Sequence, residues 1–290
     1  MSWINFEEFV DLSKLCTIKI GGKARKLFIP KTAEEVKNLL IESLSSGKKF
    51  FPIGIGSNVV FSDGTLEHIF LLTRELKKVK LWQENNFFFI EAEAGVSFRT
   101  IRDIAVKYNL EGFESLSGIP ATVGGAVVMN AGAYGTEIAD ILEKVYWISQ
   151  KGELKVFNRK EIPFSYRKSP FQEEGFVYKV VIKLKPSERD IKKIIKEHLE
   201  ERNKKQPLNY PTSGSTFKNP KEKPAGYLLE NAGMKGYRIG DVAFSEKHAN
   251  FLINLGKGRF KDLKKLIETA EKRVGDLYQI KLEREIKIVE

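Results

Sequence analysis

Residues 117–135, SGIPATVGGAVVMNAGAYG, form a glycine-rich stretch unlike any other part of this chain. The stretch holds five glycines and no Asp, Glu, Lys or Arg, although these four types make up 30% of the whole sequence. Glycine lets the backbone adopt positive φ and lets other groups approach its N–H donors. A nest of such amides suits a phosphate or a flat cofactor ring. The alternative is a tight turn between two buried strands, with Gly124-Gly125 at the turn. The stretch alone leaves both interpretations open.

A second glycine-rich segment, PIGIGSN at residues 52–58, follows two phenylalanines and precedes a short apolar run. This order predicts a strand, a loop with accessible backbone amides, and then more apolar chain. The segment does not match Gly-x-Gly-x-x-Gly, and no helical pattern follows it directly, so it does not indicate a Rossmann dinucleotide site. Two separate amide-rich loops suit a long ligand with more than one phosphate, such as FAD.

The length of 290 residues predicts two or three packed units. No apolar run approaches the ~18–20 residues that a membrane span needs. The N-terminus lacks a basic-then-apolar signal, so we expect a cytoplasmic protein without membrane insertion. The single cysteine, Cys16, excludes an internal disulfide, and a buried structural thiol is favoured over a nucleophile. No His or Cys residues have the spacing of metal ligands, so we expect no metal site.

The formal net charge of +11 raises the hypothesis of a nucleic-acid-binding protein. Such a protein gathers Lys and Arg into one patch with interleaved aromatic residues. In this chain the lysines are spread among glutamates, as in EEVKNLL and EKRVGDL. Most of them therefore indicate a solvated surface, and we expect no nucleic-acid partner.

Periodicity and turn signals predict an α/β lobe up to about residue 72, a second lobe from 73 to 200, and a C-terminal unit from 201. In the first lobe a capping box at residues 32–35 starts a helix, and strands are expected at 50–53 and 69–72. The inward face of that helix is expected to carry Val36, Leu39, Leu40 and Leu44.

The second lobe is expected to contain mostly strands. They are expected at residues 78–82, 87–92, 145–148, 154–157 and 176–184, with helices beginning after Ser97 and Ser187. A polar, proline-rich segment at 204–224 then marks a boundary. The C-terminal unit is expected to have a helix from Pro224, a strand at 251–254, a long helix carrying inward residues from Leu263 to Leu277, and an alternating strand at 280–289.

Six motifs run in order along the chain: TIKIGGKA at 17–24, GIGSN at 54–58, the central stretch at 117–135, SYRKS at 165–169, GSTFKNP at 214–220 and HANF at 248–251. Through these motifs the chain resembles the UDP-N-acetylenolpyruvoylglucosamine reductase (MurB) family, flavoproteins of cell-wall precursor synthesis. Ala121 stands where the family usually has glycine. The region between Phe171 and Val180 leaves no room for the loop whose tyrosine covers the substrate in some members, so the chain resembles the compact form.

The resemblance implies an α+β fold. It consists of a two-lobed FAD-binding domain of the PCMH (vanillyl-alcohol-oxidase) type over residues 1–200 and an α/β substrate-binding domain over 201–290. The implied reaction uses NADPH to reduce FAD. Hydride then passes from the flavin to C3 of UDP-N-acetylglucosamine enolpyruvate, and protonation at C2 gives UDP-N-acetylmuramate. The expected partners are therefore this substrate and NADPH, and we expect a monomer.

The resemblance also carries over the binding residues. The cofactor-binding residues are expected to be Gly54, Ile55, Gly56, Ser57, Asn58, Ser117, Gly118, Ile119, Thr122, Gly124, Gly125, Asn130, Gly132 and Ala133. The substrate-binding residues are expected to be Tyr166, Lys218, Asn219, His248 and Asn250. A lone histidine on a turn is otherwise more often structural.

Arg167, Ser215 and Glu285 are the expected catalytic residues. Arg167 matches the family arginine that faces the substrate carboxylate, which a planar guanidinium can hold by two parallel hydrogen bonds. Without the resemblance, a surface arginine beside Lys168 would be favoured. Ser215 matches the proton donor, although a local turn hydrogen bond is the simpler reading of a serine there. Glu285 matches the family glutamate, but a period of two places Glu283 on the same face.

A second enzyme hypothesis is a flavin oxidoreductase of the same fold that oxidises a small alcohol. It would need the two glycine-rich loops but neither SYRKS nor GSTFKNP, and both motifs are present. The sequence therefore favours the reductase.

Overall fold

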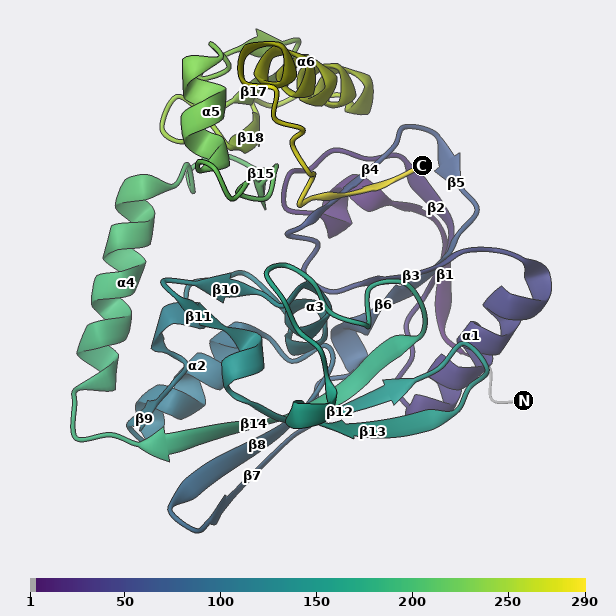
Figure 1. Ribbon diagram of the computed structural model, residues 1–290. Coiled ribbons are helices and arrows are strands. Elements are labelled where there is room, and N and C mark those ends of the chain that lie inside the picture. Colours follow the sequence, from purple (N-terminus) through teal and green to yellow (C-terminus); the bar gives the residue numbers. More distant parts are fainter. Residues whose placement is uncertain (1–3) are drawn as a thin grey trace. The chain divides into compact units, whose positions relative to one another are not determined.

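The computed structural model describes residues 4–290, which form two compact units of mixed helix and strand (Figure 1). The first unit comprises Lys26–Gly54, Glu67–Glu201 and the N-terminal residues as far as Glu8; the second comprises Phe9–Arg25, Ile55–Leu66 and Arg202–Glu290. The switch at residue 201 lies beside the predicted domain boundary. However, two N-terminal segments group with the C-terminal residues, which the sequence did not indicate. The division into an FAD domain and a substrate domain stays a prediction.

The first unit, together with the elements that run across its borders, contains both helices and strands. The helices are α1 (Ala33–Ser46), α2 (Phe98–Lys107), α3 (Val123–Met129) and α4 (Ile191–Lys205). The strands are β1 (Phe6–Asp11), β2 (Lys23–Phe28), β3 (Phe50–Ile53), β6 (Ile69–Leu72), β7 (Val79–Glu84), β8 (Phe87–Glu93), β9 (Leu110–Glu111), β10 (Gly132–Ala133), β11 (Thr136–Glu137), β12 (Leu142–Ile148), β13 (Leu154–Asn158) and β14 (Phe176–Pro186).

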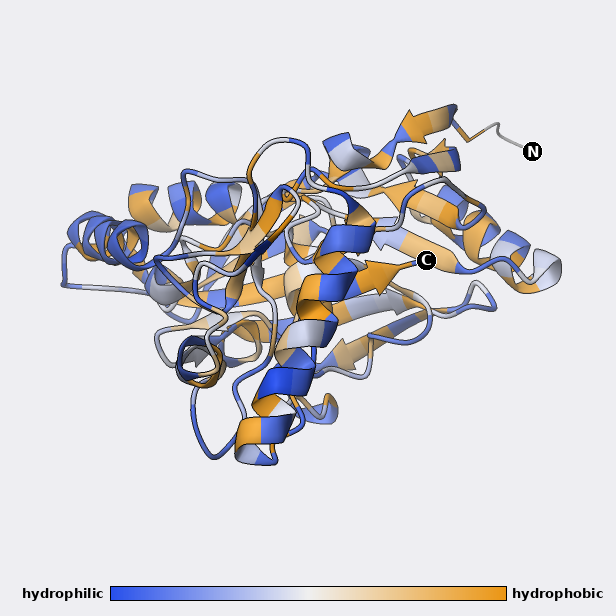
Figure 2. Ribbon diagram, turned by 90° about the horizontal axis from the view of Figure 1, so that it is seen from above, coloured by the Kyte–Doolittle hydropathy of each residue, from blue (hydrophilic) through white to orange (hydrophobic). Residues whose placement is uncertain are grey.

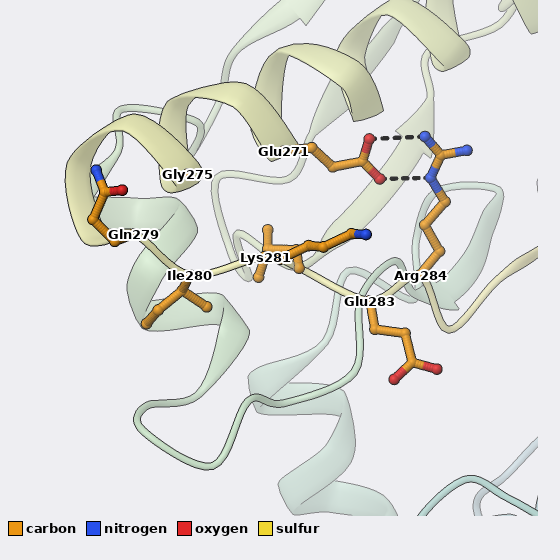
Figure 3. A pocket seen from close by; sticks show the side chains of 8 residues that line it. Glu271, Gly275, Gln279, Ile280, Lys281, Glu283 and Arg284 are labelled. Atoms are coloured by element: carbon orange, nitrogen blue, oxygen red, sulfur yellow. Dashed lines mark hydrogen bonds and ion pairs between the residues drawn. The ribbon is translucent and has the colours of Figure 1, made fainter.

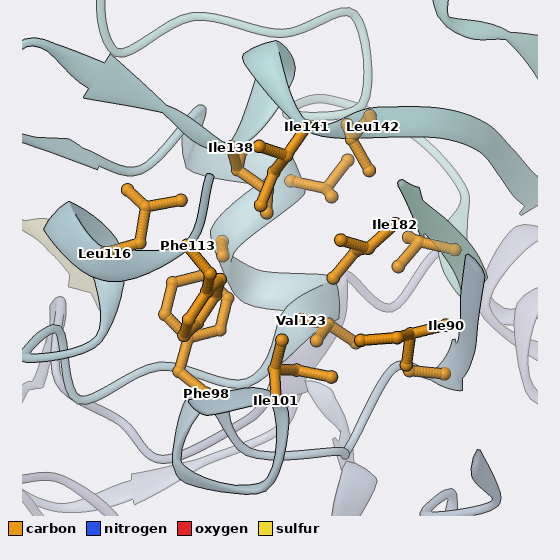
Figure 4. Close-up of a cluster of buried hydrophobic side chains, with 14 of the residues drawn as sticks. Ile90, Phe98, Ile101, Phe113, Leu116, Val123, Ile138, Ile141, Leu142 and Ile182 are labelled. Atoms are coloured by element: carbon orange, nitrogen blue, oxygen red, sulfur yellow. The ribbon is translucent and has the colours of Figure 1, made fainter. Parts of the chain in front are cut away.

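The larger sheet of the first unit is antiparallel, with strand order β13-β12-β14-β8-β7 and β9 paired to β14. Each strand predicted between residues 78 and 184 is present. Helices α2 and α3 pack on this sheet, and Figure 4 shows Phe98, Ile101 and Val123 from the helices in one apolar cluster with Ile90 and Ile182 from the strands. Burial of these side chains is the main source of the unit's stability.

The smaller sheet contains β3 and β6 as parallel neighbours, with α1 packed against it. Thr32 caps α1 as predicted, since its side chain accepts a hydrogen bond from the Glu35 amide. The prediction for Leu44 is wrong, because this residue is 53% exposed and Ser43 is buried instead. Each residue turns a helix by about 100°, so Ser43 returns to the direction of Val36, whereas Leu44 lies about 80° away.

The second unit contains α5 (Ala225–Asn231) and α6 (Phe260–Tyr278) and the strands β4 (Val59–Phe61), β5 (Thr65–Leu66), β15 (Thr212–Ser215), β16 (Arg238–Ile239), β17 (Val242–Phe244), β18 (Phe251–Asn254) and β19 (Lys287–Val289). One sheet has the order β15-β18-β17-β16, and β19 pairs in parallel with β4. The pairing of β4 with β19 explains why an N-terminal segment belongs to this unit.

Helix α6 carries both hydrophobic and hydrophilic residues in Figure 2, as expected for a helix that buries one face and exposes the other. Leu263, Leu266 and Val274 are buried as predicted, but Leu277 in the last turn is 61% exposed. The predicted strand over residues 280–289 is also too long, because only Lys287–Val289 forms one. Among the residues described, no helix is long and apolar enough to span a bilayer.

Candidate functional site

The central glycine stretch folds into a helix, α3, that the sequence did not predict. The side chain of Thr122 caps it by accepting from the Gly125 amide at 3.4 Å, and the Thr122 carbonyl accepts from the Ala126 amide at 2.9 Å. Gly124 and Gly125 therefore occupy the first helical turn. The alternative of a tight turn between two strands is wrong.

The glycines of the two glycine-rich segments differ in how closely other atoms pack against them. A Cβ on Gly54 would lie 2.5 Å from Oγ1 of Thr122, and one on Gly124 would lie 2.8 Å from the Cβ of Ala94. Both positions therefore need glycine for close packing within the protein. Gly125 differs, because it is exposed and a Cβ there would meet only Thr122 Oγ1, at 3.4 Å. Gly125 thus presents bare backbone to the outside of the unit.

Asn130 ends α3 with a positive φ of 43° and is fully buried. Its Nδ2 donates to Glu137 Oε2 at 2.6 Å and to the Ser165 carbonyl at 2.9 Å, while its Oδ1 accepts from the Ala139 amide at 3.4 Å. The carboxamide is therefore engaged within the protein. It joins the glycine stretch to the SYRKS motif, a function that the sequence did not indicate.

Arg167 lies at the tip of a turn in which Ser165 and Lys168 exchange backbone hydrogen bonds of 3.1 and 2.9 Å. Its φ of 55° is uncommon for a residue other than glycine. The guanidinium donates to the Gly132 carbonyl at 3.0 Å and to the Asn130 carbonyl at 3.4 Å. Its Cζ lies 5.1 Å from the ring centroid of Tyr166. Arg167 is thus oriented by the end of the glycine stretch.

Ser215 ends β15 in the second unit, opposite Phe251 on β18. The neighbouring Asn250 is buried, and its side chain accepts from the Phe217 amide at 3.0 Å and donates to the Phe217 carbonyl at 2.8 Å. His248 accepts from the Asn250 amide through Nδ1 at 3.2 Å, and burial lowers the pKa of its imidazole. These hydrogen bonds hold the GSTFKNP segment against the HANF segment, and all of them are made within the protein.

Glu285 and Glu283, which sequence periodicity could not separate, have different surroundings. The Glu285 amide donates to the Thr216 carbonyl at 2.8 Å, so Glu285 lies beside the residue that follows Ser215. Glu285 is half-buried. The side chain of Glu283 is 70% exposed and forms an ion pair with Lys218. The backbone of Glu285 therefore lies next to the residue that follows Ser215, whereas the side chain of Glu283 pairs with Lys218.

Two other predicted residues, Asn219 and Asn58, have hydrogen-bond partners within the protein. Asn219 Oδ1 accepts from the Ala225 amide at 3.0 Å at the start of α5. In the first glycine loop, Asn58 donates through Nδ2 to the Glu285 carbonyl at 3.1 Å and accepts from the Lys287 amide at 3.0 Å. Asn58 was predicted as a cofactor ligand, and its contacts tie this loop to the segment that carries Glu285. Only a folded structure shows such a long-range contact.

The chain is similar to known proteins over almost its whole length. A family model described as UDP-N-acetylenolpyruvoylglucosamine reductase, C-terminal domain, matches residues 206–289, and one described as FAD binding domain matches residues 24–158. The chain is 43% identical to the UDP-N-acetylenolpyruvoylglucosamine reductase of Aquifex aeolicus, over 98% of this chain and 95% of the relative. It is 40% identical to that of Streptococcus pneumoniae (strain JJA), over 99% and 94%. The crystal structure of MurB from Thermus caldophilus has a TM-score of 0.82 at 32% identity and covers 99% of this chain and 100% of that one.

Proposed function

The chain belongs to the UDP-N-acetylenolpyruvoylglucosamine reductase family and is an FAD-dependent oxidoreductase, and we propose that it uses NADPH to reduce UDP-N-acetylglucosamine enolpyruvate to UDP-N-acetylmuramate. The observation that supports this proposal is the hydrogen bond from the Glu285 amide to the Thr216 carbonyl, because it brings the backbone of Glu285 next to the residue that follows the predicted proton donor Ser215. A cytoplasmic location and a monomeric state stay predictions.

The first unit fits FAD at the exposed turn of α3. Gly125 leaves the helix backbone uncovered, and a side chain there would fill the space in which a flat ring or a phosphate can approach. Gly54 and Gly124, in contrast, serve the packing that brings the two loops together. When bound, FAD supplies hydride transfer, while the protein orients the reactants and supplies charge.

Arg167 is the proposed partner of the substrate carboxylate. Hydride addition at C3 leaves negative charge on the carbon that bears the carboxylate. A guanidinium held in a fixed orientation stabilises such charge. The carbonyls of Gly132 and Asn130 fix the plane of Arg167. The cation therefore does not have to reorganise during the reaction.

Ser215 is the proposed donor of the proton to C2, and Glu285 its acidic partner. A hydroxyl is a weak acid, so proton donation requires a neighbouring group that offsets the forming alkoxide. Among the predicted substrate-binding residues, we retain Tyr166, Lys218 and Asn219 for direct contact. We assign Asn250 to the scaffold because its carboxamide is engaged by Phe217, and His248 because its Nδ1 accepts from the Asn250 amide.

Anaerobic stopped-flow spectroscopy tests the proposal. NADPH should bleach the yellow enzyme, and the enolpyruvyl substrate should then restore the yellow colour. A colourless protein would contradict FAD binding. Yellow enzyme that a small alcohol bleaches, and that the enolpyruvyl compound does not reoxidise after reduction, would favour the alcohol-oxidising alternative.

A further inference from the structure

Residues 279–286 connect α6 to β19 and carry Glu285, yet no strand forms there. An isolated bridge between Arg284 and Phe217 and a hydrogen bond of 2.8 Å from the Lys218 amide to the Glu283 carbonyl align the segment with GSTFKNP. Leu282 and Ile286 are buried. Burial of these two residues favours the present register, but it gives the side chains between them no specific direction.

A two-pronged ion pair supplies that direction. Figure 3 shows Arg284 joined to Glu271 of α6 by two parallel hydrogen bonds, of 2.6 Å from Nε to Oε1 and 2.8 Å from Nη2 to Oε2. The side chains of Arg284 and Glu271 are 36% and 28% exposed. Such bidentate contacts are among the strongest and most directional hydrogen bonds in proteins. Glu271 belongs to helix α6, where the neighbouring residues Ala270 and Val274 are buried. The packing of this helix therefore fixes the position of the Glu271 backbone.

Arg284 directly precedes Glu285. In an extended segment, a slip of one residue turns every side chain to the opposite face. If the segment slipped, the Glu285 amide would leave the Thr216 carbonyl and the Glu285 side chain would turn to the opposite face. A pair that fixes Arg284 therefore fixes the direction of Glu285.

We propose that the Arg284–Glu271 ion pair is a positioning element that keeps Glu285 in register beside Ser215 during protonation of the substrate, an inference that rests on the roles proposed above for these two residues. Neither Arg284 nor Glu271 contacts the reacting atoms in this proposal. An ordinary surface ion pair would instead contribute little to stability and nothing to the chemistry.

The test uses the FAD-loaded enzyme with Arg284→Met, which keeps the apolar stem, and Glu271→Gln, which keeps the shape of the partner. Hydrogen–deuterium exchange at the Glu285 amide reports the register directly. We expect exchange to rise about tenfold in both variants, because bonds to charged groups are strong. Flavin reduction by NADPH should be unchanged, while reoxidation by the enolpyruvyl substrate should slow about 10- to 100-fold. Arg284→Lys should recover part of both losses.

Lys264→Met is the matched control. Lys264 also links α6 to the C-terminal segment, through a 2.6 Å ion pair with Glu290, but this pair is more exposed and lies past β19. We expect no change in either measurement. Unchanged exchange at Glu285 in Arg284→Met, or raised exchange with an unchanged substrate step, would overturn the positioning role. Failure of the parent enzyme to react with the enolpyruvyl substrate would overturn the proposed function, and the exchange comparison would still test the ion pair.

Discussion

Gly54 and Thr122 approach so closely that a Cβ on Gly54 would lie 2.5 Å from the threonine hydroxyl oxygen. Thr122 uses the same oxygen to cap α3. The contact therefore couples the position of the first glycine loop to the first turn of the helix. Gly125 lies one turn beyond this contact and faces outward, so packing and cofactor binding can be tested at different glycines.

Gly125→Val should fold normally and lose FAD. A Cβ at Gly125 meets only Thr122 Oγ1, at 3.4 Å, and valine is no worse than glycine inside a helix. The added side chain would instead occupy the approach to the backbone. Flavin absorbance per chain and the thermal midpoint of the apoprotein are the measurements. Full flavin content in Gly125→Val would show that the cofactor does not contact this turn.

Gly124→Val is the matched comparison for that variant. Its Cβ would lie 2.8 Å from the Ala94 Cβ and 3.1 Å from the Ala94 Cα. Overpacking of this kind typically costs about 1–3 kcal/mol, so the apoprotein should be destabilised whether or not flavin is present. Equal stability of the two valine variants would contradict the different surroundings of Gly124 and Gly125.

Arg167→Lys should slow the substrate half-reaction by about 10²- to 10³-fold, in the range seen when one oriented charge-stabilising donor is lost. Lysine keeps the positive charge but cannot make two parallel contacts to a carboxylate. Flavin reduction by NADPH should stay near the parental rate in stopped-flow measurements. Equal slowing of both half-reactions would indicate that Arg167 supports the fold or the cofactor, for example through the Gly132 carbonyl.

Sequence patterns predicted the elements whose local signals are strong. The strands at Phe50–Ile53 and Phe251–Asn254 and the helix capped by Thr32 are examples. Helix α3 could not be predicted, because two glycines in its first turn lower helix propensity. The Thr122 cap and burial of Val123 against the sheet override that preference.

The candidate site was harder to predict than the fold. Periodicity placed Glu283 and Glu285 on one face, and only the tertiary structure pairs Glu283 with Lys218. Asn130 and Asn250 fit a binding pattern, but their carboxamides are engaged by protein groups far away in the sequence. A sequence shows that a polar residue is present and does not show which partner satisfies it once it is buried.

Glu111 should make the stability of the first unit sensitive to acid. Contacts with Lys185, Ser187 and Arg189 lower the pKa of this carboxyl from 4.5 to about 2. Because the folded-state pKa is lower than the unfolded one, the contribution is fully present above 4.5 and is lost as the pH falls towards about 2. Denaturant unfolding should show Glu111→Gln to be less stable than the parent at neutral pH, with the difference shrinking across that window.

Glu153→Gln serves as the control for that titration. Glu153 forms an ion pair of 3.5 Å with Lys155, and both side chains are more than half exposed. Exposed pairs of this kind contribute little, so the variant should follow the parent at every pH. A pH-independent loss of stability in Glu111→Gln would contradict the electrostatic origin of its effect.

Ser215→Ala should separate hydride transfer from protonation, because the two reach different carbons in the proposed reaction. General acid catalysis contributes about 10²–10⁴-fold, so reoxidation by the enolpyruvyl substrate should slow by at least 10² while reduction by NADPH continues normally. Ser215→Cys should recover part of the rate. The control is Ser213→Ala, the same change on the same strand, since Ser213 is fully buried and its hydroxyl has no hydrogen-bond partner among residues 4–290. If Ser215→Ala reoxidises as fast as Ser213→Ala, the proton comes from another group, and Glu285 becomes the candidate.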